Sequence, residues 1–243
     1  MIVAAAARQT VRSSSRRGAS WWAMVRHVKG PDPIDRVLEF LAQFVSIGAA
    51  ERELVRRLTR VERYLKGTIL LARGAVARES WLVIEGCVRV ARRVHGADRT
   101  LAFHTELHPA IPPTLGTDAP SPVTFECVED VVASASTGEE EARAFAEHPE
   151  LESICRVMGE ALMGQVQRAH IELVSRTAEQ RYRDLVARRP DLLQRVPQYQ
   201  IASFLGIQPE TLSRIRRRLG RRRQPLTSIK NDGDTVGPRA PRP

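Results

Sequence analysis

Between residues 33 and 58 apolar positions recur every three or four residues, which predicts two short helices separated by a glycine. Over residues 61–132 the pattern changes to short β-rich runs that are separated by glycine-containing turns. Many short strands at near-regular spacing predict a small antiparallel barrel or sandwich. The proline-rich segment 108–122 is expected to be a loop, because proline cannot sit inside a sheet.

Helical spacing returns near Glu139, and one long helix is expected from Glu150 to about Ser175. Its apolar positions advance in steps of three and four, a stripe long enough for a coiled-coil seam between two subunits. The alternative is that the helix packs on its own barrel. We favour pairing, because a single long helix between two domains has few intramolecular surfaces to cover it. The predicted dimer seam consists of Leu151, Ile154, Met158, Leu162 and Val166.

The segment from Thr177 to Gln180 has the form of a capping box, in which the two side chains each satisfy a free amide at a helix start. This helix is expected to run to about Arg188, and a short element bracketed by two prolines follows it. Residues 224–243 have neither period nor apolar content, and we expect them to form a disordered tail.

Helix-turn-helix spacing is found between Gln198 and Arg217. Ala202 is small where a second helix must cross closely, and Gly206 supplies the positive φ that a tight turn between helices needs. Pro209 suits the first position of the next helix, where its missing N–H costs nothing. The predicted helix-turn-helix core is made of Ile201, Ala202, Leu205, Gly206, Ile207, Leu212 and Ile215.

The second helix of this motif has one wholly apolar face and one wholly polar face at 100° per residue. Arginine can bond guanine O6 and N7 together, and glutamate can accept from cytosine N4, so the polar face suits base edges. The alternative is a solvated face with an internal Glu–Arg pair. The predicted base-reading residues are Glu210, Ser213, Arg214 and Arg217. The predicted phosphate contacts, which fix register without reading sequence, are Gln198, Gln208, Thr211, Arg216 and Arg218.

The net charge of +10 is divided unevenly along the chain. Residues 1–30 carry six basic and no acidic side chains, residues 31–175 carry 16 basic against 22 acidic, and residues 176–243 carry 16 against six. A mildly acidic middle with a strongly basic end indicates an anionic partner at the C-terminal end. Double-stranded DNA is the first candidate, and an anionic membrane surface is the second.

Composition excludes several other classes of protein. The three cysteines are far apart and odd in number, which indicates neither a disulfide scaffold nor a zinc finger and fits a reducing cytoplasm. No apolar run is long enough for a membrane-spanning helix. The basic segment 1–32 is expected to be a disordered extension; a transit peptide and a true start at Met24 are the alternatives.

These parts together resemble the Crp/Fnr family of bacterial transcription regulators over roughly residues 33–219. The resemblance rests on KGTILLARG and WLVIEGCVRV in the barrel and on VPQYQIASFLGIQPETLSRIRRRL near the C-terminus. It implies an α+β chain with a cyclic-nucleotide-binding-like β-roll or jelly-roll barrel flanked by helices, a long dimerisation helix and a winged helix-turn-helix domain. It also implies a homodimer on a two-fold operator, with RNA polymerase as a candidate partner.

Three departures from the family pattern limit what the resemblance implies. Family members that bind cyclic nucleotide carry an arginine in a phosphate-binding cassette, whereas residues 100–142 contain no Lys or Arg. Burying a cyclic phosphate without a cationic partner is expensive, so we expect no cyclic-nucleotide binding and no cofactor. Oxygen-sensing family members hold an iron–sulfur cluster with an N-terminal group of cysteines. No cysteine precedes Cys87 here, so we do not expect this type of sensor. The segment GRRRQPLTSIK replaces a clear two-strand hairpin, so the wing is expected to be reduced.

A rival interpretation comes from His104, Glu106 and His108, whose alternation on a strand could place two imidazoles and a carboxylate on one metal, as in a cupin-like metalloenzyme. We favour a regulator without catalytic or metal-binding residues. The expected organisation is a basic extension (1–32), a β-roll sensor domain (33–148), a dimerisation helix (149–176), a helix-turn-helix domain (177–223) and a tail (224–243).

Overall fold

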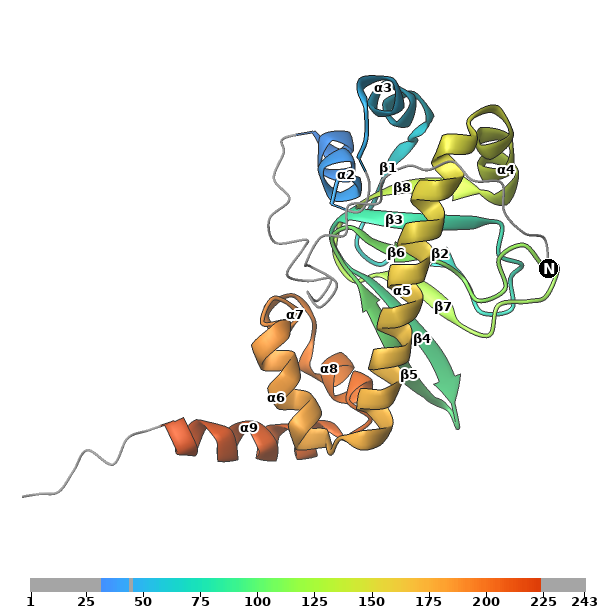
Figure 1. Ribbon diagram of the computed structural model, residues 1–243. Helices are drawn as coiled ribbons and strands as arrows, with labels where there is room; N and C mark the ends of the chain where they lie inside the picture. Colours follow the sequence, from blue (N-terminus) through green and yellow to red (C-terminus); the bar gives the residue numbers. More distant parts are fainter. Residues whose placement is uncertain (1–31, 44–45, 224–243) are drawn as a thin grey trace, which may run out of the picture.

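The computed structural model describes residues 32–43 and 46–223, and the predicted tail and nearly all of the predicted N-terminal extension lie outside this part (Figure 1). The helices are α2 (Pro33–Leu41), α3 (Ala49–Leu58), α4 (Gly138–Glu147), α5 (Pro149–Ser175), α6 (Ala178–Arg188), α7 (Leu192–Arg195), α8 (Gln198–Phe204) and α9 (Pro209–Arg223). The strands are β1 (Val61–Tyr64), β2 (Ile69–Leu71), β3 (Glu79–Glu85), β4 (Val88–Val94), β5 (Ala97–His104), β6 (His108–Ala110), β7 (Thr124–Cys127) and β8 (Val131–Thr137).

The strands form two four-stranded antiparallel sheets, ordered β1-β8-β3-β6 and β2-β7-β4-β5. Apolar side chains from both sheets meet between them, and Trp81 lies against Phe125 with ring centroids 6.0 Å apart. Buried positions alternate with partly buried ones along β7 and the middle of β3, which explains the β-rich sequence pattern without helical spacing. The predicted α+β fold with a β-roll is confirmed.

The expectation that residues 108–122 form only a loop is wrong at its start, where β6 pairs with β3 and Pro109 lies opposite Leu82. β6 is the edge strand of its sheet, so the missing N–H of Pro109 removes no bond to a further strand. The rest of this segment contains a single bridge, between Val76 and Pro120, in the described structure.

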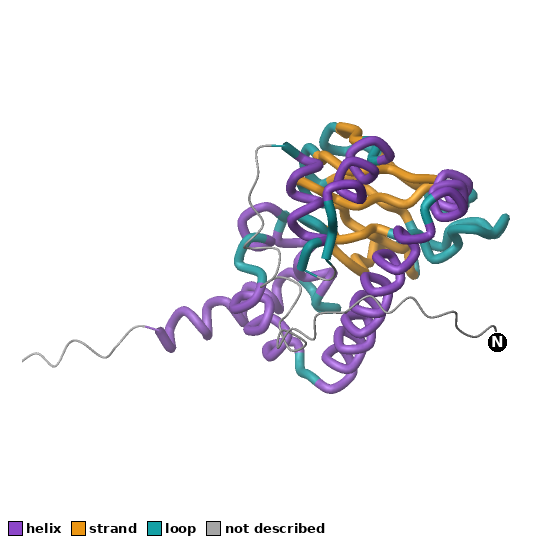
Figure 2. The backbone as a smooth tube through the Cα atoms, turned by 45° about the horizontal axis from the view of Figure 1, so that its top comes forward, coloured by secondary structure: helices purple, strands orange, loops and turns teal. Residues whose placement is uncertain are grey.

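Helix α5 spans the length of the molecule and connects the roll to the C-terminal helices (Figure 1). At its N-terminal end Leu151 and Met158 pack against a buried cluster that includes Phe40, Ile84 and Val132. Figure 2 shows α5 running down one side of the strands. None of the helices described here is long and apolar enough to cross a lipid bilayer.

The C-terminal helices do not stand apart from the roll. Their core, which includes Ile201 and Leu212, continues into one cluster with Cys87, Phe103 and Val128 of the roll. The rings of Phe103 on β5 and Phe204 on α8 meet edge to face at 5.4 Å. The helix-turn-helix segment is therefore held against β5.

Candidate DNA-binding surface

At the turn between α5 and α6, helix α6 begins with the predicted capping box, which is confirmed. The Thr177 hydroxyl accepts a hydrogen bond from the Gln180 amide, and the Gln180 side chain accepts one from the Thr177 amide. Arg181 lies one turn further and donates to the carbonyl oxygens of Leu173, Arg176 and Leu205, at 3.0, 3.0 and 2.7 Å. This guanidinium joins the end of α5, the start of α6 and the end of α8.

The two helices of the motif, α8 and α9, pack as the sequence pattern predicts. Gly206 lies between them with φ of 68°, in the left-handed region that favours glycine. Ile207 is partly buried against the cluster, and its amide donates to the Ala202 carbonyl oxygen. The buried members of the predicted core are Ile201, Ala202, Leu205, Leu212 and Ile215.

All four predicted base-reading residues, Glu210, Ser213, Arg214 and Arg217, are exposed on α9; we call this set the reading face. Arg214 makes one described contact, a hydrogen bond of 3.1 Å from its guanidinium to the Thr211 hydroxyl. Glu210, one turn earlier on α9, is also exposed. All four side chains of the reading face are therefore accessible to solvent.

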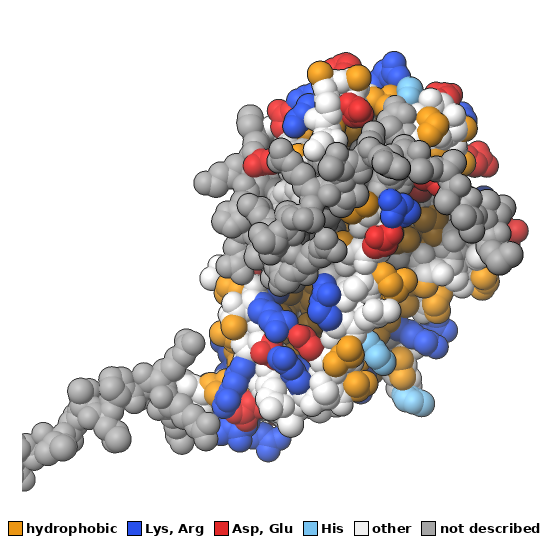
Figure 3. Space-filling model, viewed as in Figure 1, with side chains coloured by type: hydrophobic (Ala, Val, Ile, Leu, Met, Phe, Trp, Pro, Cys, Tyr) orange, Lys and Arg blue, Asp and Glu red, His pale blue; other side chains and the backbone are white. Residues whose placement is uncertain are grey.

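The predicted phosphate contacts differ from one another in their surroundings. Gln198, Gln208 and Arg216 are exposed, and Thr211 is partly buried. Arg218 instead forms an ion pair with Glu179 of α6, so part of its charge is already balanced within the protein. Figure 3 shows Lys and Arg side chains gathered over the C-terminal helices in the lower half of the view.

The predicted dimer seam is divided by the structure. Leu151 and Met158 are partly buried against the chain's own core, and the side chain of Ile154 lies outside the described part. Leu162 is partly buried, and Val166 is 58% exposed. Further along the helix, apolar side chains that are more than half exposed include Met163, Ile171, Leu173 and Val174.

The proposed metal trio is not formed. His104 and His108 do meet, with their Nδ1 atoms 2.7 Å apart, but the Glu106 carboxylate turns away to bind Arg195. Loss of hydration lowers the pKa of His108 to about 4 and that of His104 well below its usual value, so both rings are neutral near pH 7. Within the described residues, no group of three or more His, Cys, Asp or Glu could hold a metal ion.

The side chains that hold the C-terminal helices against the roll were not predicted from the sequence. Ser203 of α8 accepts a hydrogen bond from the Thr100 amide and donates to the Asp98 carbonyl oxygen. Arg189 and Arg195 bind polar side chains of the roll. The one available signal was two arginines in the short apolar element around α7, but arginines are frequent throughout this end of the chain.

No protein-family model matches the sequence, and a search of curated protein sequences also found no match. Solved structures do match. The global regulator CLP from Xanthomonas campestris, described as c-di-GMP responsive, is 16% identical with a TM-score of 0.54, covering 72% of this chain and 93% of that one. FixK2 from Bradyrhizobium japonicum is 18% identical with a TM-score of 0.53, covering 68% of this chain and 85% of that one.

A variant of CooA from Carboxydothermus hydrogenoformans is 20% identical with a TM-score of 0.50, covering 69% of this chain and 79% of that one. These neighbours are Crp/Fnr regulators, and the chain has their fold: a β-roll, a long connecting helix and a C-terminal helix-turn-helix.

Proposed function

We propose that this protein is a transcription regulator that binds DNA in a sequence-specific manner. The observation that carries the proposal is the reading face: four polar side chains stand exposed on α9 while the opposite face of α9 is buried in the helix-turn-helix core. In helix-turn-helix proteins the second helix enters the major groove, and its side chains reach base edges. Arg214 and Arg217 would read guanine, and Glu210 would read cytosine.

The protein acts as a homodimer in this proposal. In the C-terminal half of α5, Leu162, Val166, Ala169 and Leu173 follow one another in steps of four, three and four, the spacing of a coiled-coil seam. A second copy of α5 would cover the exposed apolar side chains of this half. Two reading faces would then enter successive major grooves about 34 Å apart on a two-fold operator.

The input to the regulator is not a cyclic nucleotide in this proposal, because residues 100–142 contain no Lys or Arg to balance a buried phosphate. The roll serves as the sensor domain and residues 177–223 as the DNA-binding domain. RNA polymerase contact and a cytoplasmic location are part of the same proposal. The exposed reading face, together with the unformed metal trio, favours a regulator over the metalloenzyme alternative.

Selection of bound duplexes from a random pool tests the function. We expect the wild type to enrich a two-fold motif, and Arg214→Ala to lose preference for one base at symmetric positions, at a cost of about 1–3 kcal/mol per half-site. Arg216→Gln should instead weaken binding to all sequences. It should also reduce the slope of log affinity against log salt concentration by the equivalent of about one phosphate contact per subunit.

The matched control is Arg57→Ala, which removes another exposed arginine, on α3 and far from α9 (Figure 1). This variant should select the wild-type motif. No enriched motif for the wild type, or the same motif for wild type and Arg214→Ala, would contradict the proposed readout.

A further inference from the structure

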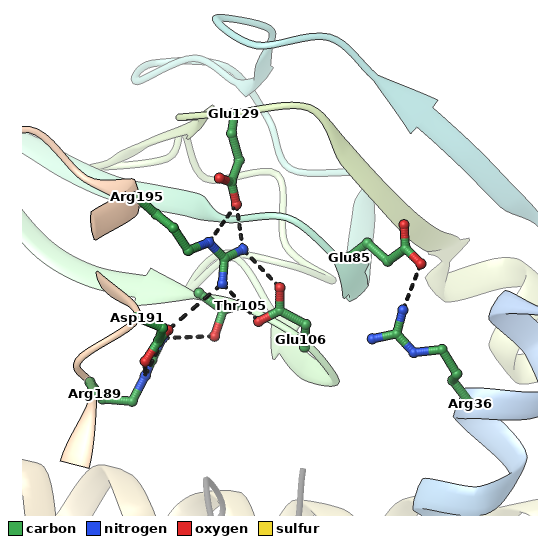
Figure 4. Close-up of polar contacts among 8 residues, drawn as sticks. All are labelled: Arg36, Glu85, Thr105, Glu106, Glu129, Arg189, Asp191 and Arg195. Atoms are coloured by element: carbon green, nitrogen blue, oxygen red, sulfur yellow. Dashed lines mark hydrogen bonds and ion pairs between the residues drawn. The ribbon is translucent and has the colours of Figure 1, made fainter. Parts of the chain in front are cut away.

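A cluster of charged side chains joins the short helix α7 to two turns of the roll. Arg195 donates to both carboxylate oxygens of Glu106, at 3.0 and 2.7 Å, and its Nε donates to Glu129 at 2.9 Å. Figure 4 shows the Arg195 guanidinium held between these two carboxylates. Burial disfavours the charge on Arg195, but the two carboxylates outweigh this effect and raise the pKa of Arg195 overall.

A second contact reinforces the first one. Arg189 is 7% exposed and donates to the hydroxyl of Thr105, which is completely buried, at 2.9 Å. Asp191 balances the charge of Arg189 through a hydrogen bond of 2.8 Å. We call Arg195, Glu106, Glu129, Arg189 and Thr105 the roll latch.

The roll latch and α8 both fasten the C-terminal helices to the roll. Ser203 binds the backbone of β5 at Thr100 and Asp98, at 2.9 and 3.1 Å, and Phe204 packs on Phe103. The helix-turn-helix is therefore fixed to the roll at α7 and at α8. Because these helices are fixed at two separated points, they cannot rotate about the turn at Thr177 without breaking the contacts at one of the two points.

This fixation leaves the DNA-contacting surface open. The reading face is exposed in the latched arrangement, as are Gln198 and Tyr199 at the start of α8. The latch contacts thus do not hide the surface that would meet DNA. Their physical effect is to restrict the orientation of that surface relative to the roll and α5.

We infer that the roll latch holds each reading face in one orientation and thereby sets the half-site spacing that the protein accepts; this inference rests on the proposed function. Arg195, Glu106 and Glu129 are positioning residues, which act on DNA through the orientation of α9. Once one reading face is bound, the second binds at an effective concentration that depends on how well it is oriented. Pre-orientation removes part of the ordering cost from the binding step.

The experiment uses the full chain and duplexes that carry the selected half-site once, or twice at varied spacing. The principal variant is Glu106→Gln with Glu129→Gln, which removes the charges of the two roll carboxylates that bind Arg195. It leaves the C-terminal helices unchanged, including Asp191 at 3.7 Å from Arg195. We expect a loss of about tenfold at the preferred spacing, a loss under about twofold on the single half-site, and a flatter dependence on spacing.

Glu85→Gln is the matched control, because Glu85 is another carboxylate of the roll, paired with Arg36 at 2.6 Å and separate from the latch (Figure 4). Because the latch variant loses two negative charges, the control also carries a second substitution, Glu62→Gln on β1. The double control Glu85→Gln with Glu62→Gln then changes the net charge by the same amount. Ser203→Ala is a milder second variant, which removes the α8–β5 hydrogen bonds and should flatten the spacing dependence in the same direction.

Several outcomes would overturn the inference. Tighter binding by the double variant would show that the latch restrains binding, and equal losses on single and paired half-sites would show a merely structural role. An unchanged spacing dependence in both latch variants would also refute it. If the wild type binds no duplex, the proposed function itself fails, and the inference fails with it; a wild type that binds while the latch variants match it refutes the inference alone.

Discussion

In the turn between α8 and α9, a substitution of Gly206 tests the effect of backbone geometry alone, because there is room for a side chain. An added Cβ at Gly206 would meet no atom closer than the Arg181 guanidinium at 3.8 Å, an ordinary contact. The cost of Gly206→Ala therefore comes from its φ of 68° alone. A left-handed conformation costs an L-residue about 1–2 kcal/mol, and reduced freedom of the unfolded chain returns about 0.4–1 kcal/mol.

We therefore expect Gly206→Ala to destabilise the protein by about 1 kcal/mol, which lowers Tm by about 2–4 °C in a chain of this size. Gly206→Asn should cost less, because asparagine tolerates the left-handed region. Thermal unfolding followed by circular dichroism measures both effects.

The control is Gly164→Ala inside α5, where the added Cβ would meet only the flexible Arg168 side chain at 3.4 Å. Because the backbone there is helical, alanine should stabilise the protein by about 0.5–1 kcal/mol. The same chemical change thus has opposite signs at the two sites. Equal effects at both sites, or a cost of Gly206→Ala above about 3 kcal/mol, would refute the reasoning.

Two further predictions concern acid stability and assembly. The pKa of His108 is lowered to about 4 in the folded state, against about 6.5 in an unfolded chain, so stability should be complete above pH 6.5 and decline between pH 6.5 and about 4. In urea unfolding at pH 7.5 and 5.0, His108→Gln should show a smaller decline than wild type, and an equal decline would contradict this assignment. Val166→Glu should leave the fold intact, because Val166 is 58% exposed, but should dissociate the homodimer. Light scattering checks this prediction, which a dimeric variant or a monomeric wild type would contradict.

The helical parts of the candidate site could be predicted from the sequence because their signals are local. The capping box at Thr177, the glycine turn at Gly206 and the inward spacing of Leu212 and Ile215 each lie within a few residues, over which helical hydrogen bonds and faces repeat. The β-rich pattern likewise predicted a small antiparallel barrel or sandwich, and the family resemblance implied the roll. It did not predict β6, because only the edge position in the sheet makes Pro109 acceptable.

Tertiary structure alone decided which polar side chains meet. His104, Glu106 and His108 share one short segment, yet the two imidazoles face each other while the carboxylate binds Arg195, 89 residues later in the chain. Leu151 and Met158 likewise follow the stripe of the long helix, and the tertiary structure packs them partly against the protein's own core. Periodicity determines which face of an element is apolar, whereas the partner of that face depends on how distant elements pack.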